Sequence, residues 1–131
     1  MKSTHRQSTL DSFRNYIGIP YEEQDCYEII QTYYREVLNL ELDDLYSSRP
    51  STEKTEQFYL EQRTRFKEID TPEFGDIIVF KVFGLACHIG MYVDKVHFFH
   101  SRKTTNSCLE KLSIWKNRVV GYYRWPQLKS E

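Results

Sequence analysis

The sequence has few of the features that place a protein in a membrane, in the secretory pathway or on nucleic acid. Residues 1–15 contain no apolar run that could form a signal-peptide core. The most apolar window, 77–93, carries Lys81 and His88, and a charge at mid-bilayer costs about 2.5–3.5 kcal/mol. Lysine plus arginine (18) nearly balance aspartate plus glutamate (19), so the basic footprint of a nucleic-acid binder is missing. We expect no signal peptide, no membrane span and no nucleic-acid partner.

Cysteine is also scarce. Cys26, Cys87 and Cys108 are odd in number and widely spaced, which disfavours a disulfide framework and suits a reducing compartment. At 131 residues the chain has room for one hydrophobic core, so we expect a single domain over residues 1–131. Only the content of aromatic residues is unusually high, at 15%. Such residues suit a sheet, a groove or a protein interface.

The clearest helix pattern runs from Asp25 to Asn39, where apolar side chains recur on one stripe. Asp25 fits an N-cap, and Glu28 three residues later completes a capping-box pattern. Cys26 is then the first helical residue, and it falls on the buried side of the stripe. A second helix is expected over Thr52–Arg65.

Strand patterns dominate the second half of the chain. They cover residues 77–83, 88–93, 96–100 and 118–123, and the second and third of these form a hairpin around Asp94 and Lys95. Helices first and strands afterwards predict an α+β fold, with N-terminal helices packed on a mostly antiparallel β-sheet.

The length of the hairpin loop decides how His88 and His100 lie. A two-residue loop pairs Val93 with Val96 and puts the two histidines on opposite faces of the sheet. A three-residue loop pairs Tyr92 with Val96 and sets His88 directly across from His100. The sequence leaves both registers open, and we favour the second.

In the second register, two imidazoles share a sheet face on which the helix of Cys26 is expected to pack. A helix N-terminus and a nearby imidazolium lower the pKa of a thiol and so generate a nucleophilic thiolate. His88 then acts as base and acid, His100 fixes its tautomer, and N–H groups at the helix start face an oxyanion. A zinc site made of Cys26, His88 and His100 is the competing use of the same residues.

Each of these cysteine and histidine residues also has a purely structural interpretation. A lone cysteine on an apolar stripe is most often a packing residue, and a single sheet histidine is most often structural. His5 and His97 are interpreted as solvated or structural residues. Cys108, Trp115 and Trp125 are expected in the core.

The arrangement resembles a known family, the NlpC-like cysteine peptidases, which are permuted relatives of papain that act on bacterial cell-wall peptides. The matching segments, in chain order, are Gly18-Ile19-Pro20-Tyr21, Asp25-Cys26, Gly75-Asp76-Ile77-Ile78-Val79-Phe80, His88-Ile89-Gly90-Met91-Tyr92-Val93 and Phe98-Phe99-His100. The resemblance implies a permuted papain-like fold without metal or cofactor, and cleavage of an amide in the stem peptide of peptidoglycan, typically between D-glutamate and the diamino acid.

The resemblance also implies a role for each site residue. Cys26 is the nucleophile, His88 the base and His100 the orienting residue of a Cys-His-His triad. Asp25 caps the helix beside the nucleophile. Tyr21 places a hydroxyl near the nucleophile, where it binds substrate or assists the oxyanion.

Within that family the chain looks most like the small phage-type members. The features that favour this are the segment from Tyr27 to Arg35, the polar middle of the chain and the ending 119–124. They imply a virion (tail) protein made in the host cytoplasm, with peptidoglycan peptides and other phage tail proteins as partners. Two alternatives stay open: a structural tail-tip or tail-assembly subunit with weak or no hydrolysis, and an acyltransferase or esterase that uses the same triad.

Overall fold

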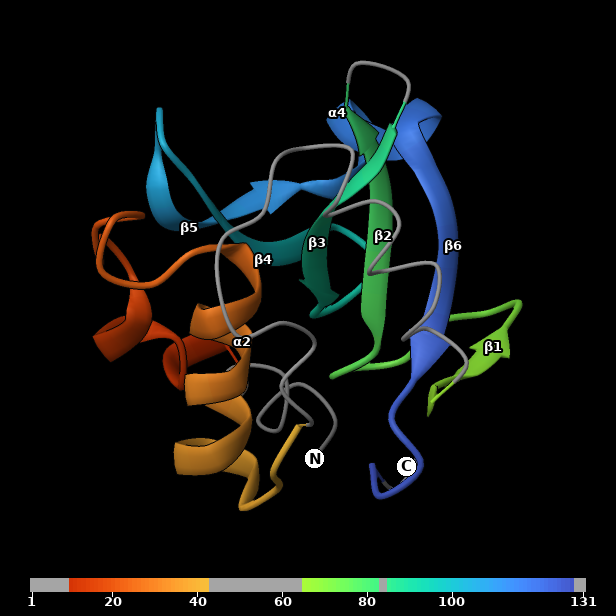
Figure 1. Cartoon of the computed structure of the whole chain (residues 1–131), viewed down its shortest axis with the longest axis horizontal. Coiled ribbons are helices and arrows are strands. Elements are labelled where there is room, and N and C mark those ends of the chain that lie inside the picture. The colour runs from red at the N-terminus through yellow and green to blue at the C-terminus, as the bar shows by residue number, and fades with distance from the viewer. Residues whose placement is uncertain (1–9, 43–64, 83–84, 129–131) are drawn as a thin grey trace.

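A six-stranded antiparallel sheet forms the centre of the structure. The computed structural model describes residues 10–42, 65–82 and 85–128. The strands are β1 (Lys67–Ile69), β2 (Ile77–Val82), β3 (Leu85–Tyr92), β4 (His97–Arg102), β5 (Asn106–Lys111) and β6 (Val119–Arg124). Their order across the sheet is β1-β6-β2-β3-β4-β5, so β1 and β5 lie at opposite edges (Figure 1). This sheet with helices packed on it confirms the predicted α+β class.

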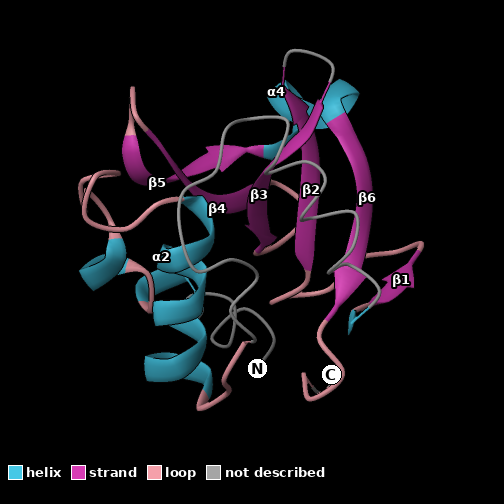
Figure 2. Ribbon diagram, in the orientation of Figure 1, coloured by secondary structure: helices cyan, strands magenta, loops and turns pink. Residues whose placement is uncertain are grey.

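Among the described residues, the helical elements form two groups along the chain (Figure 2). The first group precedes the sheet and consists of a 3-10 turn, η1 (Arg14–Tyr16), the helix α2 (Cys26–Tyr33) and a π-helical turn, η2 (Tyr34–Leu38). The second, α4 (Leu112–Trp115) with η4 (Lys116–Arg118), leads into β6 at the end far from β1. No helix among the described residues is both long enough and apolar enough to cross a bilayer.

The start of α2 is as predicted. The Oδ1 atom of Asp25 accepts hydrogen bonds from the backbone N–H groups of Tyr27 (3.1 Å) and Glu28 (2.9 Å). The Asp25 N–H in turn donates to Oε1 of Glu28 over 2.9 Å, which completes the capping box. Cys26 is therefore the first residue of α2. The helical segment ends at the predicted place, but its last turn widens to π geometry, and Asn39 follows with φ of 57°.

Each face of the sheet carries its own apolar cluster, because successive side chains along a strand point to opposite faces. On one face, α2 packs against β3 and β4. The cluster on this α2 face contains Cys26, Tyr27, Ile29, Ile30, Tyr33 and Tyr34 of the helical segment and Ile77, Val79, Ile89, Met91, Phe99 and Tyr123 of the strands. The opposite face carries a smaller cluster of Ile78, Phe80, Phe98, Leu112 and Trp115. We call it the Trp115 face.

Most predicted elements are present, with small shifts of their ends. The four predicted strands correspond to β2, β3, β4 and β6. Four of the described elements lack a counterpart in the sequence-based prediction: β1, β5, α4 and η4. The helix predicted over Thr52–Arg65 lies outside the described residues. Trp115 and Trp125 are buried as expected.

Candidate active site

The hairpin that carries both histidines has a longer connection than either predicted register. β3 and β4 pair Met91 with Phe99 and Tyr92 with Phe98. The turn is held by Oδ1 of Asp94, which accepts from the backbone N–H groups of Val96 (2.8 Å) and His97 (2.7 Å). Both predicted loop lengths are therefore wrong. The prediction that the two histidines share a face is confirmed, but in this register they are diagonal neighbours and not direct partners.

The two imidazoles are in direct contact. Nε2 of His88 lies 2.8 Å from Nδ1 of His100, and both residues are buried. Their rings pack among the aromatic side chains of the Trp115 face: Phe80 and Trp115 lie beside His88, and Phe98 lies 4.4 Å from His100 between ring centroids. Gly90 makes room for this packing, since a Cβ there would be 2.8 Å from the Phe98 ring. Sheet pairing and aromatic packing thus fix the two rings relative to each other.

Burial sets the charge of this pair. Loss of solvation, together with the neighbouring His100 and Arg102, lowers the pKa of His88 from 6.5 to about 3. Burial also lowers the pKa of His100, although the hydrogen bond to Glu110 opposes that effect. Both rings are therefore neutral at pH 7. The imidazolium that the sequence-based hypothesis placed beside the thiol is not the resting form of His88.

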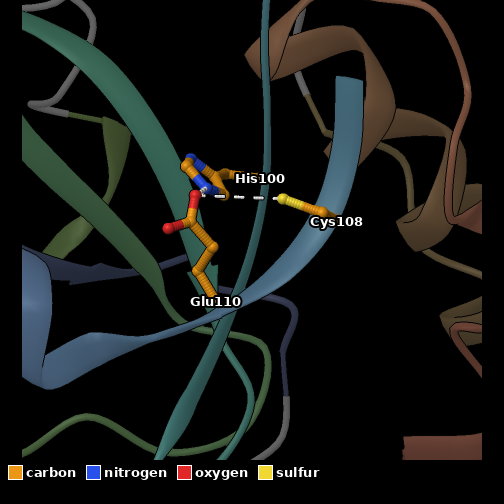
Figure 3. A group of neighbouring side chains, drawn as sticks. All are labelled: His100, Cys108 and Glu110. Atoms are coloured by element: carbon orange, nitrogen blue, oxygen red, sulfur yellow. Dashed lines mark hydrogen bonds and ion pairs between the residues drawn. The ribbon is translucent and has the colours of Figure 1, made fainter. Parts of the chain in front are cut away.

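A third polar residue continues the line of contacts (Figure 3). Oε1 of Glu110 lies 2.7 Å from Nε2 of His100. The other carboxylate oxygen, Oε2, accepts from Nε1 of Trp115 over 3.3 Å. Glu110 comes from β5, which pairs with β4 so that Cys108 faces His100 and Glu110 faces Phe98. Sequence reasoning missed Glu110 because β5 was not recognised: the segment Asn106–Lys111 has mixed polarity and no apolar alternation.

Cys26 lies where α2 begins, and its side chain is 4% exposed. It belongs to the cluster on the α2 face, whereas His88 and His100 point to the Trp115 face. The expectation that α2 packs on the face of the imidazoles is therefore wrong: Ile89 and Met91 face the helix, so the alternation turns His88 away from it. The Cys26–His88 contact stays a prediction.

The loop before α2 is fixed to the strand that carries Glu110. Gly18 N donates to the carbonyl of Ser107 (2.8 Å), and Ser107 N donates to the carbonyl of Ile19 (3.1 Å). Tyr21 follows in the same loop, where its backbone N–H donates to Oδ1 of Asn106 over 3.3 Å. These contacts tie the approach to Cys26 to the start of β5. The predicted role of the Tyr21 hydroxyl stays a prediction.

The N-cap of α2 limits which backbone N–H groups can donate a hydrogen bond to an oxyanion. The sequence-based hypothesis assigned this role to the N–H groups at the start of α2, including that of Cys26. Those of Tyr27 and Glu28 are taken by the Asp25 carboxylate, and that of Ile29 donates to the Asp25 carbonyl over 3.0 Å. These three donors therefore stabilise the helix start and are unavailable to a substrate.

The residues that could ligate a metal differ from the predicted set. His100, Cys108 and Glu110 place one donor atom each within 4.8 Å of the others, a mixture of nitrogen, sulfur and oxygen that suits zinc. In this structure the same atoms form hydrogen bonds, including a long one from the Cys108 thiol to Oε1 of Glu110 (3.9 Å). Cys108 is half-buried rather than in the core, and burial raises its pKa. His97 faces away from His100 and bonds Asp94.

The structure is that of an α+β protein with a cysteine at a capped helix start and, on its antiparallel sheet, a buried pair of hydrogen-bonded histidines. Comparison with known families makes this specific. The NlpC/P60 family matches residues 14–124, most of the chain, and the protein belongs to that family. No curated protein shows significant sequence similarity to it.

Solved structures with the same fold agree with this assignment. One is a protein from Staphylococcus aureus described as similar to lipoprotein, NLP/P60 family, with a TM-score of 0.61 and 22% identity. The match covers 92% of this chain but only 41% of the staphylococcal chain. Another is the NlpC/p60 domain of the peptidoglycan hydrolase SagA, with a TM-score of 0.58, 12% identity, and 90% and 97% of the two chains covered.

Proposed function

We propose that the protein is a cysteine peptidase that hydrolyses an amide bond in the stem peptide of peptidoglycan. Membership of the NlpC/P60 family supports a hydrolase of this kind, and the SagA domain, a peptidoglycan hydrolase by name, shares the fold. The observation that carries the proposal is the 2.8 Å contact between His88 and His100, a base held by its orienting partner. In the family that the chain resembles, the bond cut is typically the one between D-glutamate and the diamino acid.

The proposed reaction uses Cys26 as nucleophile. Nδ1 of His88 removes the thiol proton while sulfur attacks the amide carbonyl, and a tetrahedral oxyanion forms. The C–N bond then breaks, and the imidazolium of His88 gives its proton to the leaving amine. Water, deprotonated by His88, attacks the thioester and releases the acid and the free thiol. Because His88 is neutral at rest, it acts as a general base in the first step.

Turnover of purified muropeptides tests this proposal. We expect Cys26→Ser and His88→Ala to lower kcat at least about 1000-fold, since each removes a member of a unit that acts together. Cys108→Ser is the matched control, because it makes the same change at a thiol outside the proposed reaction, and it should retain wild-type turnover. Equal turnover by wild type and Cys26→Ser, or none by the wild type, overturns the proposal. Turnover of esters but not of muropeptides would point to an esterase or acyltransferase.

The place of the protein in a phage tail is a finer proposal. Its support is in the sequence: the segment from Tyr27 to Arg35 and the ending 119–124, which look like those of phage-type members. Mass spectrometry of purified virions should detect the protein in tail fractions together with other tail proteins. Its absence from virions contradicts this placement. If Cys26→Ser virions assemble and infect as well as wild type, the protein is a structural subunit instead.

A further inference from the structure

Glu110 ends a chain of three polar side chains that crosses the Trp115 face. Its Oε1 atom contacts Nε2 of His100 (2.7 Å), and Nδ1 of His100 contacts Nε2 of His88 (2.8 Å). His100 is fully buried, so each of its two ring nitrogens has one protein partner and no access to bulk water. The direction of both hydrogen bonds is therefore set inside the protein.

The charge of Glu110 determines that direction. Burial raises the pKa of its carboxyl group, but hydrogen bonds from His100 and Trp115 and the charge of Arg102 outweigh this, and the net shift is downward. An ionised carboxylate can only accept hydrogen bonds, so Nε2 of His100 must carry a proton. The neutral His100 ring then has a bare Nδ1, which can only accept, and His88 must donate from Nε2. The other nitrogen of His88, Nδ1, is left without a proton.

We propose that Glu110 is a positioning residue, which acts through His100 to keep Nδ1 of His88 bare and ready to take the proton of the nucleophile. The inference rests on the proposed function for the identity of that nucleophile, but the tautomers of the two rings do not depend on it. Without the carboxylate, the His100 ring can adopt the other tautomer, in which the proton is on Nδ1. His88 then accepts at Nε2 and carries its own proton on Nδ1, where it cannot act as a base.

The surroundings of Glu110 hold the carboxylate in place. Nε1 of Trp115 binds its second oxygen, and the Trp115 ring is flanked by the guanidinium groups of Arg102 and Arg118 at 4.9 and 4.8 Å from its centroid. Glu110 is thus the acidic end of a chain supported by an aromatic ring and by nearby positive charge. Carboxylates that orient metal-bound histidines are typically worth about 10- to 100-fold in activity, and we expect an effect of that size for the same hydrogen bond here.

The experiment measures tautomers and turnover together. Long-range ¹H–¹⁵N correlation spectra of the full chain distinguish a protonated ring nitrogen from a bare one. In the wild type we expect a proton on Nε2 and a bare Nδ1 for both His88 and His100. Glu110→Gln, which keeps the shape but removes the charge, should mix the tautomers and lower kcat about 10- to 100-fold with little change in KM. Glu110→Asp, which keeps the charge, should restore the wild-type tautomers and part of the turnover.

Glu68→Gln is the matched control. It makes the same change on β1, at the opposite edge of the sheet from β5, at an exposed position. It should leave tautomers and kcat unchanged. A wild-type proton on Nδ1 of either ring overturns the proposal, and so do identical tautomers in wild type and Glu110→Gln. If the variants fail to fold, the wild-type spectrum still decides.

A metal site at the same residues gives a different result. If His100, Cys108 and Glu110 bind zinc, the purified protein contains stoichiometric metal that is lost on Cys108→Ser, and this outcome overturns the proposal. If the wild type shows the expected tautomers but no muropeptide turnover, the proposed function fails while the effect of Glu110 on the rings stands.

Discussion

The two faces of the sheet use aromatic side chains for different purposes. On the α2 face, rings pack on rings: Phe13 stacks on Tyr33 with centroids 4.3 Å apart, and Phe99 lies 4.8 Å from Phe13. Two tyrosine hydroxyls there have local partners: that of Tyr33 bonds Ser12, and that of Tyr34 donates to the carbonyl of Gly75. On the Trp115 face, the rings surround imidazoles.

The difference shows how a small sheet can keep most of its apolar packing apart from a buried pair of imidazoles. The α2 face buries more apolar side chains, so it supplies most of the apolar stabilisation. The Trp115 face buries fewer, but it excludes water from His88 and His100 and thereby keeps them neutral. Neighbouring residues of one strand serve the two purposes, because alternation sends them to opposite faces.

The largest expected effect comes from Phe98 and Phe99, neighbours on β4 that are both fully buried on opposite faces. Truncation of either ring should cost about 3–5 kcal/mol in the free energy of unfolding, measured with urea. Phe99→Ala should leave the ¹⁵N signals of His88 and His100 unchanged. Phe98→Ala should shift those of His100, since the two rings are 4.4 Å apart. Equal shifts in both variants would contradict the separation of the faces.

Acid should destabilise the protein through the Trp115 face. Between its unfolded pKa of 6.5 and its folded pKa of about 3, His88 binds a proton when unfolded but not when folded. Its contribution to stability is therefore complete above pH 6.5 and is lost as the pH falls, by up to about 1.4 kcal/mol per pH unit. Urea unfolding at a series of pH values measures this slope.

A His88→Gln variant provides the comparison for that slope. Aspartate and glutamate titrate in both proteins and largely cancel in the difference, so wild type should lose more stability than the variant between pH 6.5 and pH 4. Parallel curves would mean that His88 is hydrated and titrates normally.

Sequence reasoning succeeded where the signal is local. Asp25 and Glu28 predict the capping box and the position of Cys26 because the interaction spans three residues. The strand patterns of β2, β3 and β4 are strongly apolar and were recognised. His88 and His100 both have even residue numbers. They therefore lie on one face of the sheet in any hairpin register that pairs even-numbered residues with even-numbered residues.

It failed where the information lies in tertiary contacts. Asp94 stabilises a longer turn through its side chain, and this decided the register of the hairpin. β5 is an edge strand of mixed polarity whose pairing with β4 gives Glu110 its partner, and no apolar alternation marks it. The apolar stripe of α2 shows which side of the helix is buried, but it does not show which face of the sheet the helix covers. That choice depends on where both apolar clusters can be buried.

The smallest effect is expected at the start of α2, where Cys26 lies. Asp25→Ala removes the acceptor of two backbone hydrogen bonds and should lower the free energy of unfolding by about 1 kcal/mol. Asp25→Asn keeps a capping oxygen and should stay within a few tenths of a kcal/mol of wild type. Because Asp25 acts on the helix and not on the imidazoles, neither change should alter the His88 and His100 tautomers. A tautomer change in Asp25→Ala would show instead that the start of α2 and the Trp115 face are coupled across the sheet.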